Sequence, residues 1–168
     1  IASQSRISNA LIKFADQGGT VIGICNGFQI LTELKLLPGT LVRNKNLKFI
    51  CKDINLKVNK NSRFTNLYNN NEVIRIPIAH AEGNYYTDKK TLKKLKDNDQ
   101  IIFSYCNENG DITKESNPNG SLLNIAGITN KKGNVIGLMP HPERVSEKVF
   151  NNTDGIKFFK SVVNYHNY

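Results

Sequence analysis

The 168-residue sequence has no tryptophan, a single methionine and only three cysteines. The cysteines, at positions 25, 51 and 106, lie far apart and form no CxxC pair. This spacing argues against a disulfide framework and against a zinc site. We therefore expect no metal site and a reducing compartment, which indicates a cytoplasmic protein. The sequence also lacks a secretory signal and any apolar run of the roughly 18 residues that a transmembrane helix requires, so no membrane partner is predicted.

The charge is one-sided, with 23 Lys and Arg against 14 Asp and Glu and a formal net charge of +9. The lysines are dispersed, and neither interleaved aromatic residues nor a nucleic-acid-binding module accompanies them. We therefore expect no nucleic-acid partner, and a nucleic-acid role based on charge alone is the least favoured hypothesis. The length and a hydrophobic content of 39% predict a single domain over residues 1–168 with a substantial core.

The hydrophobic periodicity predicts an α/β fold. A helix at 8–15 precedes a buried strand at 21–24, a tight turn at 25–27 and a second helix that ends at Pro38. This succession is typical of a mostly parallel sheet with flanking helices. The first helix is expected to bury one face, made of Ala10, Leu11, Phe14 and Ala15.

The rest of the sequence predicts an added antiparallel portion. Residues 107–121, rich in Asn, Gly and Pro, predict a long loop of the kind that is often functional. Pro77 marks the end or the edge of its strand. Strands are expected at 49–58, 73–78, 101–105, 125–129 and 135–138, the last two forming a hairpin, and helices at 91–96 and 153–165. The last helix is expected to bury Ile156, Phe159, Val162 and Val163.

Cys25 carries the strongest chemical signal. It ends the predicted strand two residues before Gly27, as in a nucleophile elbow, where a strained strand-to-helix turn lifts the side chain out of the sheet. The next residue, Asn26, offers a backbone N–H that can stabilise an oxyanion, and the helix start favours the thiolate. An isolated cysteine at a strand end is more often a buried structural residue, and the Gly-x-Cys-x-Gly-x-Gln pattern reverses that preference.

His141 is the candidate base for this nucleophile. It follows the predicted strand 135–138, and Glu143 lies two residues further on, so that both side chains can reach one side of an extended segment. The flanking prolines restrict the backbone. Glu143 can accept the ring N–H of His141 and fix its tautomer. A loop with a surface ion pair is the alternative interpretation, and His166 is expected to be a surface residue.

Together, the segments GICNGFQ at 23–29 and PHPER at 140–144 resemble the class I, triad-type glutamine amidotransferases. The resemblance implies a flavodoxin-like sheet, Cys25 as nucleophile, His141 as general base and Glu143 as its orienter. It also implies Gln29 beside the bound glutamine, with Asn26 and Gly27 as oxyanion or substrate-binding groups. Further collinear matches, which run through nearly the whole chain, narrow the resemblance to the glutaminases of phosphoribosylformylglycinamidine synthase; they lie at 36–39, 43–44, 77–85, 117–121, 125–128 and 137–144.

This resemblance implies that the chain hydrolyses glutamine through a γ-glutamyl thioester and passes ammonia to a large synthetase subunit in purine biosynthesis. A small accessory subunit is a further expected partner. No cofactor is implied for this chain, since ATP and Mg²⁺ belong to the synthetase. His80, Glu82 and Asn119 lie in segments peculiar to this subfamily, and they are expected to face the partner or to gate the glutaminase. A hydrogen-bonded pair at a strand end is the alternative for His80 and Glu82.

Two further expectations concern activity. Family members begin with a strand and a glycine-rich turn that supplies the other oxyanion donor, and these have no match in the sequence from Ile1 onward. We therefore expect a domain without its N-terminal strands and weak or no activity in this chain alone. The alternatives are the glutaminase of another amidotransferase, such as GMP or carbamoyl phosphate synthase, and a non-catalytic docking subunit.

Overall fold

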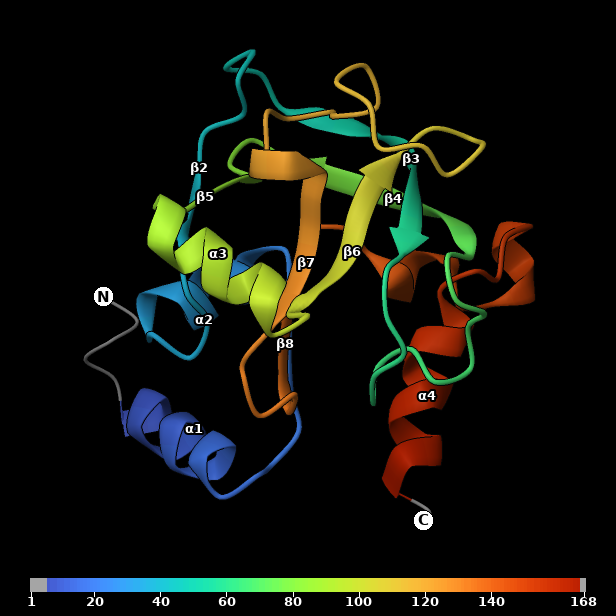
Figure 1. Ribbon diagram of the computed structural model, residues 1–168. Coiled ribbons are helices and arrows are strands. Elements are labelled where there is room, and N and C mark those ends of the chain that lie inside the picture. Colours follow the sequence, from blue (N-terminus) through green and yellow to red (C-terminus); the bar gives the residue numbers. More distant parts are fainter. Residues whose placement is uncertain (1–5, 167–168) are drawn as a thin grey trace.

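The computed structural model describes residues 6–166 and contains a six-stranded sheet and a two-stranded sheet (Figure 1). The six strands follow the order β1 (Val21–Ile24), β8 (Val135–Leu138), β7 (Ile125–Thr129), β6 (Ile101–Cys106), β3 (Ile50–Val58) and β4 (Val73–His80). The small sheet pairs β2 (Thr40–Val42) with β5 (Asn84–Tyr86). The helices are α1 (Arg6–Asp16), α2 (Asn26–Glu33), α3 (Lys89–Asp97) and α4 (Ile156–His166), with 3-10 turns η2 (Leu122–Asn124), η3 (Pro142–Val145) and η4 (Lys148–Phe150).

The α/β class, the flanking helices, the antiparallel portion and the predicted β7–β8 hairpin are confirmed, but the expectation of a mostly parallel sheet does not hold among the described strands. Among the described strands only β1 and β8 run parallel, and the other neighbours in the large sheet are antiparallel. A parallel pair needs a long crossover, usually a helix. The β7–β8 turn and the helix-free connection from β3 to β4 instead return the chain beside the strand it has just left.

The two faces of the large sheet bury separate cores. One core receives Ala15 from α1, Phe28 and Leu31 from α2 and Leu95 from α3, and the other receives Phe158 from α4. In β8 the neighbours Val135 and Ile136 point into opposite cores, as the alternation of a strand requires. Figure 1 accordingly shows α1, α2 and α3 on one side of the sheet and α4 on the other.

The inner faces of the outer helices differ from the prediction. In α1, Ala15 is buried as expected, whereas Phe14 is 51% exposed. In α4, Phe158 and Ser161 are buried, whereas Val163 is 60% exposed. Contacts from elsewhere in the chain determine which side of α4 faces inward. Ser161 Oγ accepts a hydrogen bond from the Leu67 N–H at 3.1 Å, and the periodicity within the helix does not predict such a contact.

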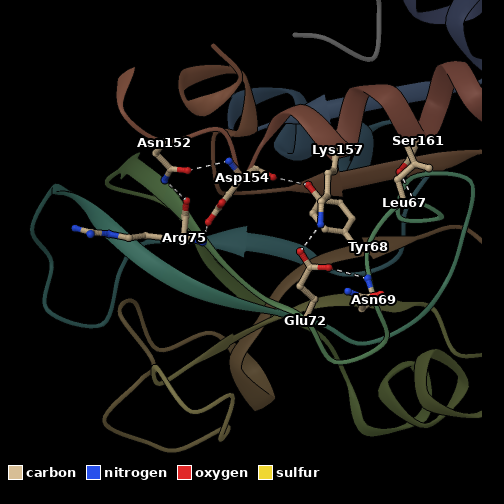
Figure 2. Close-up of polar contacts among 9 residues, drawn as sticks. All are labelled: Leu67, Tyr68, Asn69, Glu72, Arg75, Asn152, Asp154, Lys157 and Ser161. Atoms are coloured by element: carbon tan, nitrogen blue, oxygen red, sulfur yellow. Dashed lines mark hydrogen bonds and ion pairs between the residues drawn. The ribbon is translucent and has the colours of Figure 1, made fainter. Parts of the chain in front are cut away.

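The chain that leads into α4 covers the outer edge of β4. The Arg75 N–H donates to Asp154 Oδ2 at 2.8 Å, and the Arg75 carbonyl accepts from Asn152 Nδ2 at 2.8 Å (Figure 2). Lys157 pairs with Glu72 at 2.7 Å on the same side. These side chains satisfy backbone groups that an open sheet edge leaves unpaired. Pro77 lies within this edge strand, as its missing N–H predicts.

Over residues 6–166, no helix has both the length and the apolar character that crossing a bilayer would require.

Gly137 offers a test of the packing between β8 and α2. A Cβ atom at this position would overlap the buried Phe28 ring and lie 2.6 Å from Leu37 Cδ1. We expect Gly137→Ala to lower the free energy of unfolding by about 1–3 kcal/mol, as measured by urea denaturation. Gly27→Ala is the matched control, because a Cβ there meets nothing within 4 Å. Equal free energies of unfolding for the two variants would contradict the close packing of β8 against α2.

Candidate active site

Cys25 occupies the turn between β1 and α2. Its backbone has φ 53° and ψ −107°, a region that non-glycine residues rarely adopt and that stores strain. The turn is held by the Cys25 N–H, which donates to the Leu138 carbonyl at 2.8 Å. Strand and helix are so close that a Cβ on Gly23 would lie 2.7 Å from the Gly27 backbone. The predicted strained elbow is thus confirmed, and it leaves no room for a side chain at Gly23.

His141 lies directly beyond β8 and is fixed at both its backbone and its ring. Its N–H donates to the Pro77 carbonyl at 2.8 Å, and its Nδ1 lies 2.5 Å from Glu143 Oε1. With Nδ1 donating to the carboxylate, Nε2 is left as the acceptor. His141 is only 8% exposed, and its buried Nε2 has no hydrogen-bond partner within the described region. A buried acceptor without a partner is costly and is typical of a functional group.

Cys25 and His141 line one pocket of about 500 Å³. Asn26 and Gln29 line it from the start of α2, and Arg144 lines it beside His141. The end of β4 and the following turn, residues 79–82, also line it, as do Ile24 and Phe49. Another cavity, of about 670 Å³, lies between α3 and the 107–121 loop. It holds no cysteine or histidine among its lining residues, so the smaller pocket is the candidate active site.

The remaining predicted site residues lie at different depths. Gln29 Nε2 donates to the Glu82 carbonyl at 3.0 Å, across the pocket. The Glu82 side chain is exposed and lies 3.9 Å from Arg43 Nε, where a partner could reach it. His80 and Asn119, in contrast, are 4% and 1% exposed. They lie in the interior and present no side chain to a partner in this structure.

Comparison with known proteins assigns the family. Residues 1–166 match the model of the CobB/CobQ-like glutamine amidotransferase domain. The chain belongs to this family. It is 51% identical over 164 residues to phosphoribosylformylglycinamidine synthase subunit PurQ of Aquifex aeolicus, covering 97% of this chain and 72% of the relative. It is 52% identical over 164 residues to the same subunit of Pyrococcus horikoshii, covering 97% and 71%.

Solved structures agree with this assignment. The structure described as PurLQS from Thermotoga maritima matches this amidotransferase with a TM-score of 0.83 and 41% identity, over 98% of this chain and 70% of that one. A glutamine amidotransferase from the same organism matches with a TM-score of 0.52 and 17% identity, over 81% and 46%. The second likeness concerns the fold alone. The first likeness, at 41% identity, is to a chain of the structure described as PurLQS.

The surroundings of Cys25 raise the pKa of its thiol. Burial is the largest cause; the Asn26 backbone N–H and then the Arg144 charge oppose it, while the Glu143 charge adds to it. The predicted lowering by the helix start is therefore present at Asn26 but is outweighed by desolvation. The resting amidotransferase keeps Cys25 protonated, and its Sγ donates to the Ala79 carbonyl at 3.7 Å.

Some groups around the site were not predicted from the sequence. The carbonyls of Pro77 and Ala79 accept hydrogen bonds from the His141 N–H and the Cys25 thiol, and no side-chain pattern identifies a carbonyl because every residue has one. Asn44 lies inside the fold and is 0% exposed. In the sequence, Asn44 stood out only because it lies in the collinear match at 43–44, and that match assigned it no role. Arg144, at the end of the PHPER segment, was a motif residue without an assigned function.

Arg144 provides a test of the electrostatics of the site. Its positive charge stabilises the Cys25 thiolate, so Arg144→Gln should raise the Cys25 pKa further. At pH 8 we expect alkylation of Cys25 by iodoacetamide to slow by up to about tenfold, the effect of one pKa unit. The rate is read by peptide mass spectrometry against the exposed Cys51. Lys148→Gln, an exposed charge outside the pocket, is the control. An unchanged alkylation rate at Cys25 in Arg144→Gln would show that the Arg144 charge does not affect the thiol.

Proposed function

We propose that this amidotransferase is the glutaminase subunit of a phosphoribosylformylglycinamidine synthase. It hydrolyses glutamine to glutamate and ammonia, and the ammonia is used by a synthetase subunit in purine biosynthesis. The observation that carries the proposal is the shared pocket of Cys25 and His141, in which a thiol on a strained turn and a buried, unpartnered imidazole nitrogen come together. The identity to PurQ subunits supports the choice of reaction.

The proposed roles follow from the resting protonation states. Because the thiol pKa is raised, Cys25 needs a base to become a nucleophile. His141 Nε2 supplies it, since its other ring nitrogen is engaged by Glu143 at 2.5 Å. When Nε2 takes the thiol proton, the Glu143 carboxylate stabilises the imidazolium that forms. Glu143 is thus the orienting member of a Cys–His–Glu triad.

The reaction then proceeds in two halves. The Cys25 thiolate attacks the side-chain amide carbon of glutamine, and the carbonyl oxygen becomes an oxyanion. The imidazolium of His141 gives its proton to the departing nitrogen, which leaves as ammonia while a γ-glutamyl thioester remains on Cys25. Water, deprotonated by His141, attacks the thioester, and glutamate leaves as the thiol is restored.

The groups at the start of α2 are suited to the oxyanion. The Asn26 backbone N–H lies within reach of Cys25 Sγ. The oxyanion forms beside the attacking sulfur, so a donor at this position can stabilise it. Gly27 leaves open space, because a Cβ there would meet no atom within 4 Å. We assign both residues to oxyanion and substrate binding. Gln29, whose amide already spans the pocket to Glu82, would contact the bound glutamine.

The partner belongs to the proposal as well. The similar chain from Thermotoga maritima belongs to a structure described as PurLQS. By analogy we infer a large synthetase partner and a small accessory subunit for this chain. ATP and Mg²⁺ would serve the synthetase, and this chain would work without a cofactor. The exposed Glu82 and Arg43 beside the pocket mouth are the residues of the site that such a partner would contact.

The test is covalent labelling of Cys25 by a glutamine-like electrophile. In the complex with the synthetase subunit we expect one adduct per chain, blocked by excess glutamine and located by peptide mapping at Cys25, and in the chain alone we expect slower labelling at the same residue. His141→Gln should slow the labelling about a hundredfold or more, the usual contribution of a general base. The assay is run on the chain alone and on its complex with the synthetase subunit, because the second oxyanion donor is not assigned within residues 6–166.

The controls separate the rival functions. Cys25→Ala should abolish the adduct, while the exposed Cys51 and the buried Cys106 should stay unlabelled. Absence of a glutamine-blocked adduct in both the chain and the complex would overturn the glutaminase and leave a docking subunit. A complex that forms only with a GMP or carbamoyl phosphate synthetase would retain the chemistry and overturn the choice of partner.

A further inference from the structure

His80 interrupts a buried apolar row. The inward residues of β4 are Ile74, Ile76, Ile78 and His80, and each is no more than 4% exposed. His80 is the last of them, and it lines the pocket together with Cys25 and His141. A polar ring at such a depth costs free energy unless its nitrogens have partners. The chemistry of those partners therefore shows what the ring does.

Asn44 fixes the proton on one ring nitrogen. Asn44 Nδ2 donates to the carbonyls of Lys48 and His80, both at 2.8 Å, which leaves its Oδ1 as an acceptor. Oδ1 accepts from the Gly83 N–H at 3.0 Å and lies 3.1 Å from His80 Nδ1. His80 Nδ1 must therefore carry the hydrogen.

Asn119 faces the other ring nitrogen with a donor. Its Oδ1 accepts from the Ser121 N–H at 3.0 Å, so its Nδ2 is the donor. Nδ2 donates to the Gly83 carbonyl at 2.8 Å and to the Tyr105 hydroxyl at 3.2 Å, and it lies 3.5 Å from His80 Nε2. A protonated ring would set two donors against each other here. Burial, followed by the nearby His141, lowers the His80 pKa from 6.5 to about 4, in agreement with a neutral ring.

These contacts join three separate segments beneath the pocket. Asn44 belongs to the β2–β3 connection, His80 to the end of β4, and Asn119 to the 107–121 loop. Backbone bonds reinforce the junction, from the Asn44 N–H to the Ala81 carbonyl at 2.8 Å and from the Lys45 N–H to the Asn119 carbonyl at 2.9 Å. The middle segment, residues 79–83, is held from both sides.

That middle segment touches the proposed nucleophile and the substrate side of the pocket. The Ala79 carbonyl accepts from Cys25 Sγ at 3.7 Å, and the Glu82 carbonyl accepts from Gln29 Nε2 at 3.0 Å. Gly83 leaves no spare room, because a Cβ there would overlap the His80 ring. A shift of the ring would therefore move the wall that Cys25 and Gln29 contact.

We propose that His80 is a positioning residue of the glutaminase, which bridges Asn44 and Asn119 and thereby holds the 79–83 wall against Cys25 and Gln29. Its neutral state also places no positive charge beside His141, which must become charged when it takes the thiol proton. The inference rests on the proposed function for its substrate and on the hydrogen-bond geometry for the role of the ring.

Two substitutions separate a hydrogen-bonding role from simple space filling. In His80→Asn the new amide can occupy the place of Nδ1 and donate to Asn44, although a cavity remains. His80→Phe keeps a ring of similar size but cannot donate. We expect His80→Phe to slow glutamine-blocked labelling of Cys25 about tenfold to a hundredfold, the range for a misplaced reacting group, and His80→Asn to recover most of the rate. The reverse order would show that the ring only fills space and would overturn the proposal.

The three cysteines provide internal controls. Iodoacetamide needs no glutamine pocket, so its rate at Cys25 relative to the exposed Cys51 reports on the wall alone. We expect this ratio to change in His80→Phe and to stay near the parent value in His80→Asn. A parent chain that fails glutamine-blocked labelling but shows this contrast would overturn the proposed function and keep the positioning role. Equal ratios in both variants would overturn the positioning role. His166→Phe, at the exposed end of α4, is the matched histidine control.

Loss of folding is detected at the buried Cys106, which iodoacetamide reaches only when the chain unfolds. If His80→Phe exposes Cys106, Asn119→Ala carries the test instead, because it removes the donor that faces the His80 ring and the Gly83 carbonyl, the two contacts by which Asn119 holds the wall. We expect this variant to keep Cys106 protected and to slow glutamine-blocked labelling at Cys25. A parental rate in a folded Asn119→Ala would overturn the proposal.

Discussion

The outer edge of β4 is the constraint on which the site depends. The carbonyls of Arg75, Pro77 and Ala79 lie two residues apart, so that they face the same side of the strand. They accept hydrogen bonds from the Asn152 side chain, the His141 N–H and the Cys25 thiol, in that order along the strand. One strand therefore aligns the approach to α4, the proposed base and the proposed nucleophile. The repeat of the β-strand spaces the two carbonyls that hold the last two groups.

Covering this edge also holds the segment around His141 in place. Pro77 has no N–H, so its carbonyl is the only backbone group there that needs a partner. The His141 N–H donates to it. On the other side Gly155 packs so closely that a Cβ would overlap the Pro142 carbonyl, and its N–H donates to the Val145 carbonyl at 2.9 Å. The start of α4 thus supports the turn that carries Glu143. An edge that would otherwise be open to aggregation holds the proposed base.

The electrostatics of the pocket explain why the thiol needs that base. Burial keeps Cys25 protonated despite the Asn26 N–H and the Arg144 charge. The groups behind the pocket are neutral amides and a neutral imidazole, Asn44, Asn119 and His80. A thiol that stays protonated at rest is protected from adventitious oxidation and alkylation, because the thiolate is the reactive form. In the proposed mechanism the reactive thiolate forms only when His141 accepts the proton.

The sequence by itself determined the local elements and the chemical character of the side chains that line the pocket. The strand before Cys25, the turn, the β7–β8 hairpin and the His141–Glu143 pair all depend on neighbours in the chain, and the structure has each of them. Only the tertiary structure decided that the described sheet is mostly antiparallel, that Val163 faces outward and that His80 and Asn119 are buried. It also decided that the Pro77 and Ala79 carbonyls hold the site. These features arise from contacts between segments far apart in sequence and from backbone groups that all residues share, so no local pattern of side chains encodes them.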